Sequence, residues 1–185
     1  MIARGGEPQS RRYHHEHGDA VVFFDPPPAR SRLVVVSATD VARELRRHAA
    51  RLGDETVLVE SRAERITTAD RSQPGRVAGS FEDTPLDERT DVVFTDHDAP
   101  EIGDRLAEVL RSPARFVGVM GSRRHVAPYL EGLRRMGFDD DAIGRIRSPV
   151  GLDLGGQRPE QIALSIVAGV VAARHGRDGG WMDER

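Results

Sequence analysis

Two glycine-containing stretches carry the residue types best suited to bind an anion. Residues 116–124 read FVGVMGSRR and residues 148–156 read SPVGLDLGG, so each is an apolar run that ends at glycines beside hydroxyl or charged groups. This pattern is typical of a strand that ends in a binding loop, where glycine lets a ligand approach the backbone. Ser122, Arg123 and Arg124 would offer a phosphate a helix-start hydroxyl and two guanidinium groups. The alternative is a plain strand–turn–helix junction with solvated arginines, because a Gly-x-x-Gly turn is a weak signal.

A second group of reactive side chains follows the strand that we predict at residues 91–95. The sequence Thr95-Asp96-His97-Asp98 places two carboxylates around an imidazole at the carboxyl end of that strand. Such a group could bind a metal or move a proton. Alternatively, Asp98 caps the next helix and His97 is a partly exposed loop residue. We include Thr95 and His97 among the candidate ligand-binding residues, and we expect no protein site for a free metal.

The first strand–helix–strand unit contains a third candidate site. Residues 32–36 predict a buried strand, Thr39 or Asp40 can cap an amphipathic helix, and residues 56–60 predict a second strand. The second strand ends at Glu60. This residue lies about as far along the chain as the carboxylate that binds a ribose hydroxyl in dinucleotide-binding folds.

The turn inside this unit argues against ordinary NAD(P) binding. It reads Ser37-Ala38-Thr39-Asp40 and has none of the glycines of a dinucleotide fingerprint. The side chains of Ser37 and Thr39 would crowd a pyrophosphate, and Asp40 would repel it. We therefore expect Ser37, Ala38 and Thr39 to contact a differently placed ligand.

Strands and helices alternate along the rest of the chain. We predict further strands at 75–80, 91–95 and 115–119, a last strand or extended segment at 149–154, and helices at 101–111, 122–136 and 139–145 and from Pro159 onward. Pro128 falls deep in the helix at 122–136, so that helix either kinks or begins again there. The alternation predicts an α/β fold, a Rossmann-like three-layer sandwich with a doubly wound, mostly parallel sheet. Ser37, Glu60, His97 and Gly121 then meet at the carboxyl edge of the sheet, where such folds bind ligands.

The composition of the 185-residue chain excludes several classes of protein. Its net charge of −3 provides no basic face for nucleic acid, and the lack of cysteine excludes disulfides and thiolate catalysis. No apolar run reaches membrane-spanning length and the N-terminus has no signal core, so we expect a cytoplasmic protein without a membrane partner. We divide the chain into a tail and linker at 1–29, which includes a short strand at 20–25, one domain at 30–176, and a C-terminal tail at 177–185.

Between Arg30 and Arg174 the chain resembles the XdhC family, the accessory factors of xanthine dehydrogenase and related molybdenum hydroxylases. The segments that carry the resemblance are 87–90, 95–98, 116–124, 149–155 and 159–166. The resemblance implies a Rossmann-like, nucleotide-binding type of domain that binds molybdenum cofactor and delivers it to an apo-hydroxylase of the xanthine dehydrogenase or carbon monoxide dehydrogenase type. It also implies a cysteine desulfurase and a second copy of the chain as partners. The ligand-binding positions carried over are Arg62, Gly118, Gly121, Ser122, Arg123, Gly151, Asp153 and Gly155.

The chain departs from the family pattern at three places. The first turn usually reads Gly-Ala-Gly-His, Glu60 replaces a usual aspartate, and Gly169 replaces a common acidic residue. We also expect no room for the N-terminal domain that most members carry. The leading hypothesis is a non-catalytic maturation factor that binds molybdenum cofactor or a related phosphate ligand. The alternatives are an NAD(P)-binding oxidoreductase, which Glu60 and the fold favour, and an interaction module that has lost its nucleotide.

Overall fold

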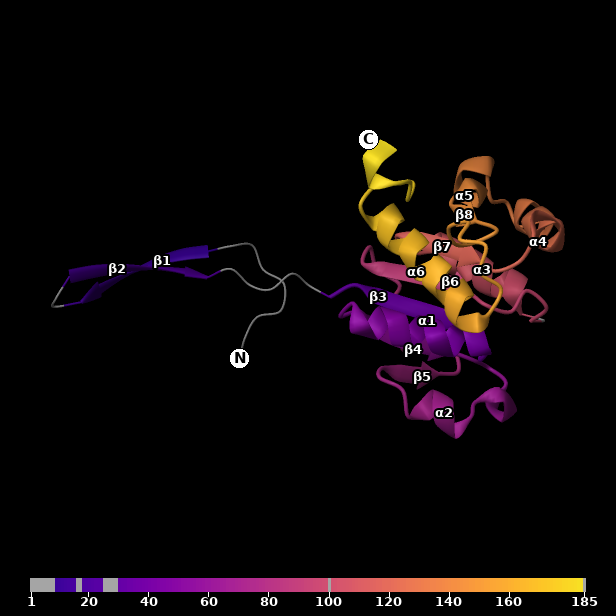
Figure 1. Ribbon diagram of the computed structural model, residues 1–185, viewed down its shortest axis with the longest axis horizontal. Helices are drawn as coiled ribbons and strands as arrows, with labels where there is room; N and C mark the ends of the chain where they lie inside the picture. Colours follow the sequence, from indigo (N-terminus) through magenta and orange to yellow (C-terminus); the bar gives the residue numbers. More distant parts are fainter. Residues whose placement is uncertain (1–8, 16–17, 25–29, 100, 185) are drawn as a thin grey trace. The chain divides into compact units, whose positions relative to one another are not determined.

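The computed structural model describes residues 9–15, 18–24, 30–99 and 101–184, and the chain divides into two compact units, residues 1–30 and 31–185. In the first unit, β1 (Gln9–His15) and β2 (Gly18–Phe24) form an antiparallel hairpin (Figure 1). β2 includes most of the strand predicted at 20–25, whereas no strand was predicted where β1 lies. The side chains of residues 10–14 are all exposed in the structure. A strand without a buried face needs no alternation of apolar and polar residues, so the sequence carries no such signal here.

The second unit is built on a six-stranded parallel sheet. Its strands are β3 (Arg32–Val36), β4 (Glu55–Val59), β5 (Arg76–Ala78), β6 (Thr90–Phe94), β7 (Phe116–Val119) and β8 (Ile146–Arg147). They lie in the order β5-β4-β3-β6-β7-β8. The chain winds outward from β3 to β5, returns to the other side of β3 at β6, and winds outward again to β8. This arrangement confirms the predicted doubly wound fold and places its switch point between β3 and β6.

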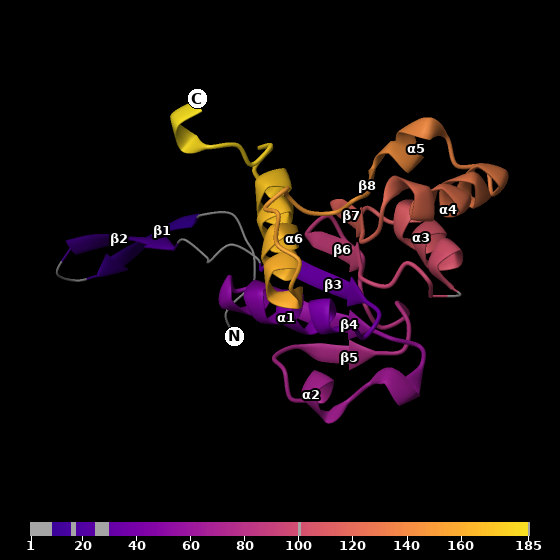
Figure 2. The same ribbon diagram turned by 45° about the vertical axis from the view of Figure 1, so that its right-hand side comes forward.

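Helices cover both faces of the sheet (Figures 1 and 2). On one face lie α1 (Asp40–Arg51) and α6 (Pro159–Arg174), and on the other α3 (Ile102–Arg111), α4 (Arg123–Arg135) and α5 (Asp140–Gly144). Successive strand residues point to opposite faces of the sheet. Leu33 and Val35 therefore pack under α1 and α6, while Val34 and Val36 belong to the core on the opposite face, under α3, α4 and α5. Both faces of the sheet are therefore buried, which explains why the central strands are unbroken runs of apolar residues.

The remaining helical elements are short. They are η1 (Ala63–Arg65) and α2 (Thr68–Arg71), which follow β4, and η2 (Met182–Glu184) near the end of the chain. α4 runs through Pro128 as one helix, so a new helix does not begin there. Among the described residues, no helix has both the length and the apolar character needed to cross a bilayer.

The last strand differs from the prediction. We predicted a last strand or an extended segment at residues 149–154; the strand, β8, precedes that segment, and 149–154 is an extended stretch that lies along α6. The backbone N–H of Leu152 donates to the Ser165 carbonyl at 3.2 Å, and the Ser165 hydroxyl donates back to the Leu152 carbonyl at 2.5 Å. A Cβ on Gly169 would lie 3.3 Å from the Cα of Gly151, so Gly169 allows this segment to approach the helix closely.

Ion pairs connect the secondary-structure elements at the amino edge of the sheet. Asp91 is fully buried and receives Arg115 at 2.7 Å and Arg174 at 2.8 Å. Arg174, at the end of α6, also pairs with Asp54 at 2.7 Å. Burial alone would lower the pKa of Arg174, but the hydrogen bonds and charges of Asp54 and Asp91 raise it above its usual value. These contacts attach α6 to the loop before β4 and to β6.

Candidate functional site

The turn between β3 and α1 keeps a backbone conformation that glycine favours, although it contains no glycine. Ser37 has φ of +80°, is buried, and donates its N–H to the carbonyl of Val59 at 2.8 Å. Thr39 is the N-cap of α1 and accepts the N–H of Ala42 at 3.1 Å. The turn therefore combines one left-handed residue, Ser37, with a side-chain cap at the start of α1.

The hydroxyl of Thr95 ties this turn to the neighbouring strand. Thr95 follows β6, and its Oγ1 lies 3.0 Å from the carbonyl oxygen of Val36 and 3.1 Å from that of Ser37. The same oxygen accepts a hydrogen bond from Thr39 Oγ1 at 3.0 Å. The predicted site residues Ser37, Thr39 and Thr95 are thus brought together, and their polar groups bond to one another across the switch point.

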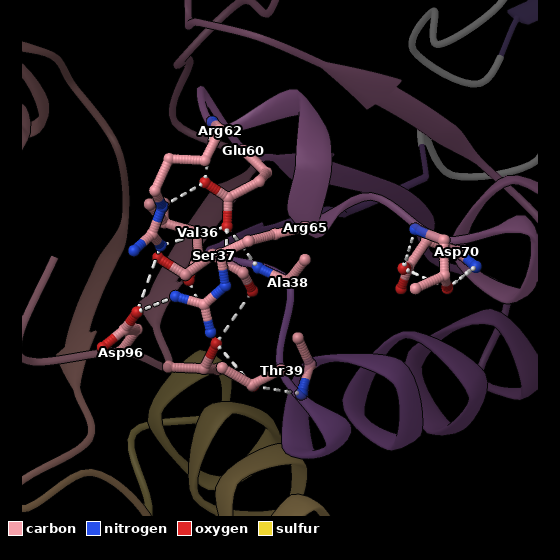
Figure 3. A network of polar contacts seen from close by, with 12 residues as sticks. Val36, Ser37, Ala38, Thr39, Glu60, Arg62, Arg65, Asp70 and Asp96 are labelled. Atoms are coloured by element: carbon pink, nitrogen blue, oxygen red, sulfur yellow. Dashed lines mark hydrogen bonds and ion pairs between the residues drawn. The ribbon is translucent and has the colours of Figure 1, made fainter.

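Glu60 occupies the space next to the first turn (Figure 3). One carboxylate oxygen, Oε2, accepts the backbone N–H of Ala38 at 2.9 Å, and the other, Oε1, accepts the backbone N–H of Arg62 at 3.0 Å. The Arg62 guanidinium adds two bonds, Nε to Oε1 at 2.8 Å and Nη2 to Oε2 at 3.1 Å. Burial would raise the pKa of Glu60, but these hydrogen bonds and the Arg62 charge hold it below its usual value. Glu60 is therefore an internal anion bound where a ligand phosphate would meet the first turn.

A second carboxylate lies on the other side of the two arginines. Asp96, after β6, accepts Arg62 Nη2 at 3.1 Å and Arg65 Nη1 at 2.6 Å on the same oxygen, Oδ2. Burial would raise the pKa of Asp96, but hydrogen bonds from the two arginines and from the N–H of Asp98 lower it. Figure 3 shows Arg62 and Arg65 extending from the segment after β4 across the first turn toward Asp96. We call Glu60, Arg62, Arg65 and Asp96 the crevice network.

A small cleft lies beside part of the crevice network. It has a cavity volume of about 40 Å³, and its walls include Ser37, Glu60, Arg62, Ile102 and Arg105. Pockets that hold drug-sized ligands and cofactors usually measure about 300–1,000 Å³. The cleft is therefore smaller than a cofactor-sized pocket.

A second cluster of polar side chains lies where β6 and β7 end. The ring of His97 stacks on that of His125, with centroids 4.9 Å apart and planes 26° apart. The Ser122 hydroxyl lies 3.0 Å from His125 Nδ1 and does not cap α4, for which Ser122 is the N-cap residue. Gly121 has φ of +145°, and a Cβ there would lie 3.4 Å from His97. The structure thus brings together three predicted residues, His97, Gly121 and Ser122, while the side chain of Arg123 lies outside the described part.

Two of the predicted glycines make room for protein rather than for a ligand. A Cβ on Gly118 would lie 2.4 Å from Cγ2 of Val150, and a Cβ on Gly151 would lie 2.5 Å from the Ser165 hydroxyl. Gly155 has φ of +70° with open space around it, and Asp153 is exposed. Within the described ranges, no three His, Asp or Glu side chains are grouped so as to hold a metal ion.

Three residues that the structure places in these clusters were not among the predicted site residues. Arg65 and His125 were not identified, and Asp96 was noted only as a neighbour of His97. The sequence spacing could have indicated His125, because residues three apart on a helix are neighbours on the same face, as Ser122 and His125 are. Arg65 and Asp96 are 31 residues apart in the chain, so the sequence gives no sign that they pair.

Comparison with known proteins identifies relatives of this chain. The sequence profile described as the XdhC Rossmann domain matches residues 33–170. YqeB, an uncharacterized protein of Escherichia coli strain K12, is 30% identical over 173 residues, which cover 89% of this chain and 31% of that protein. A crystal structure described as a xanthine dehydrogenase from Bacillus halodurans shares the fold, with a TM-score of 0.68 and 23% identity over 85% of this chain and 47% of that chain.

The matches cover most of this chain but only part of each relative. The chain spans about a third of the curated relative and about half of the structural relative. The profile match runs from β3 into α6 and so includes the whole sheet and both polar clusters. The chain therefore belongs to the XdhC Rossmann domain family.

Proposed function

We propose that this domain is an accessory protein of a molybdenum hydroxylase and that it holds molybdenum cofactor, or a related phosphate-bearing ligand, at the carboxyl edge of its sheet. Membership of the XdhC family supports the accessory role. The structural relative described as a xanthine dehydrogenase supports an enzyme of that type as the partner.

The observation that carries the proposal is the position of two guanidinium groups at the switch point. Arg62 and Arg65 both reach Asp96 beside the first turn, where doubly wound folds bind their ligands. Guanidinium groups match phosphate oxygens in charge and geometry, and their binding does not depend on glycines in the first turn. A chain with Ser37, Ala38 and Thr39 at that turn would bind its anion through these arginines.

The residues present fit the phosphate of such a cofactor. Arg62 and Arg65 would hold the phosphate, and the Ser122 hydroxyl and the His97–His125 pair are polar groups suited to an organic ring system at the other half of the edge. Bound molybdenum cofactor would supply a molybdenum centre that is already coordinated by its own organic ligand. The domain needs no metal ligands of its own for this role, and its task is to bind and shield.

Native mass spectrometry tests the proposal directly. We expect a mass increase when molybdenum cofactor is added to the purified protein, and a smaller bound fraction for Arg65→Gln. Arg47→Gln is the matched control, because Arg47 is a half-exposed arginine on α1 that pairs with Glu44, away from the crevice network. A failure to bind cofactor, or equal binding by Arg65→Gln and the wild type, would refute the proposed site.

A second candidate function, NAD(P)-dependent oxidoreduction, rests on two observations. The strand order is that of dinucleotide-binding folds, and Ser37 retains the left-handed turn. However, the N–H of Ala38, which would face a pyrophosphate, is already bonded to Glu60. NADPH in a parallel measurement decides between the two functions, since a mass increase with NADPH alone would favour the oxidoreductase.

A further inference from the structure

Within the crevice network, Asp96 occupies the place of an anionic ligand. Two arginines from one segment donate to the same oxygen of this carboxylate, at 3.1 and 2.6 Å. The convergence of two guanidinium groups on one acceptor is how proteins bind a doubly charged phosphate. Here a singly charged carboxylate of the chain itself fills that position.

The network has an inner layer and an outer layer. The Glu60 side chain is 1% exposed and is held by two backbone N–H groups as well as by Arg62, so it is fixed. Arg65 is 35% exposed, and its close partner is Asp96, because its Nε is 4.0 Å from Glu60. The outer pair of Arg65 and Asp96 can therefore separate while Glu60 keeps its hydrogen bonds.

The position of Asp96 in the fold also favours its release. Asp96 lies in the loop between β6 and α3. Among the residues that the structure describes, the one partner of its second oxygen, Oδ1, is local: the N–H of Asp98 at 3.1 Å. Rotation of this side chain breaks no strand or helix hydrogen bond. It leaves Arg65 Nη1 without its acceptor, whereas Arg62 keeps its two bonds to Glu60 and loses only the bond from Nη2 to Asp96.

We propose that Asp96 is a built-in competing ligand of the Arg62–Arg65 pair and that it makes the site selective for phosphate monoesters. This inference rests on the proposed function and specifies its ligand class. A ligand must displace a tethered carboxylate, so a group with one charge gains little from the exchange. A phosphate monoester has a second ionisation near pH 6 and presents close to two charges at neutral pH, whereas an internal diester presents one.

The selectivity has a consequence for the kind of cofactor that binds. A ligand with a terminal phosphate, whether on a pterin or at a ribose 2′-hydroxyl, meets the requirement. A ligand whose only phosphates are bridging does not offer the doubly charged monoester that this pair selects.

Titration with two simple probes tests the proposal. Methyl phosphate and dimethyl phosphate are added to the full chain at pH 7.5, and the arginine Nε–Hε signals are followed by NMR. We expect methyl phosphate to bind more tightly than dimethyl phosphate, and Asp96→Asn to lower its dissociation constant by about tenfold or more, because the competing state is removed. At pH 5.5 the advantage of the monoester should shrink as it loses its second charge.

Asp140→Asn is the matched control, because it also removes one carboxylate from an arginine pair. Asp140 lies on α5, pairs with Arg134 at 3.2 Å, and is 86% exposed. Equal tightening in Asp140→Asn, no change in folded Asp96→Asn, or equal binding of the two probes would overturn the proposal. If Asp96→Asn does not fold, Arg65→Gln replaces it: loss of methyl phosphate binding supports the site, and unchanged binding overturns it.

The outcome is separable from that of the proposed function. Binding of molybdenum cofactor without any effect of Asp96 would leave the accessory role standing and remove the competing-ligand mechanism. A strong effect of Asp96 on methyl phosphate, without a mass increase on addition of cofactor, would refute cofactor binding and retain the monoester site.

Discussion

Glu60→Gln should destabilise the domain far more than an ordinary surface substitution. Each carboxylate oxygen of Glu60 accepts two hydrogen bonds, one from a backbone N–H and one from the Arg62 guanidinium. In glutamine one oxygen becomes an NH₂ group, so two N–H donors face another donor whichever way the amide is turned. Unsatisfied buried donors cost about 1–3 kcal/mol each, and we expect the free energy of unfolding to fall by about 3 kcal/mol.

Urea unfolding followed by far-UV circular dichroism measures this loss. With a denaturant dependence of about 2 kcal/mol per molar urea, the midpoint should fall by about 1.5 M. Glu44→Gln is the control, because Glu44 pairs with Arg47 on the surface of α1, and we expect a change below about 0.5 kcal/mol. A loss below about 1 kcal/mol for Glu60→Gln would refute the view that its hydrogen bonds fix the first turn.

The same variant changes the dependence of stability on pH. The pKa of Glu60 is lowered in the folded protein, so its contribution is fully present above the unfolded value of about 4.3 and disappears as the pH falls through the lower folded value. The wild type should therefore lose more stability than Glu60→Gln on acidification below about pH 4.5. Parallel acid profiles for the two proteins would contradict this assignment.

Two further predictions concern the packing of α6. Gly151→Ala should lower the free energy of unfolding by about 2–3 kcal/mol, because φ at Gly151 is +106° and the new Cβ would lie 2.5 Å from the Ser165 hydroxyl. Gly155→Ala is the control: Gly155 also has a positive φ but lies in open space, so its replacement should cost about 1 kcal/mol. Equal losses in the two variants would contradict the packing argument. Arg174→Met should cost about 3 kcal/mol and lower the melting temperature by several degrees in calorimetry, because it leaves Asp54 without this partner and Asp91 with Arg115 alone. A melting temperature within about 1 °C of the wild type would show that these buried charges are compensated in another way.

The fold was predictable where local pattern and tertiary structure agree. The β-branched runs at residues 32–36 and 91–95 predicted strands because both faces of a central parallel strand are buried. The run at 149–154 alternates apolar residues with others, but it forms no strand: Val150 is partly buried against the core beneath α1 and α6, and Leu154 is exposed. Alternation alone does not distinguish a strand from an extended segment that lies beside a helix.

The site was predictable in its location but only partly in its members. The carboxyl edge, Glu60 and Arg62 follow from the topology and the family resemblance. The pairing of Arg65 with Asp96 does not, because it depends on how two loops meet across β3. Gly118 and Gly151 show a further limit, since a glycine that admits a neighbouring side chain looks the same in sequence as one that admits a ligand.

The lengths of the strands determine where another chain could extend a sheet of this protein. The outer strands of the parallel sheet, β5 and β8, have three and two residues, so each presents few unpaired backbone groups. Short edges of this kind protect a sheet from edge-to-edge aggregation. The hairpin strands β1 and β2 have seven residues each, and each strand has one long edge that the other does not cover. Among the described strands, the short edges of the parallel sheet thus disfavour strand addition, and the hairpin strands offer the longer edges for it.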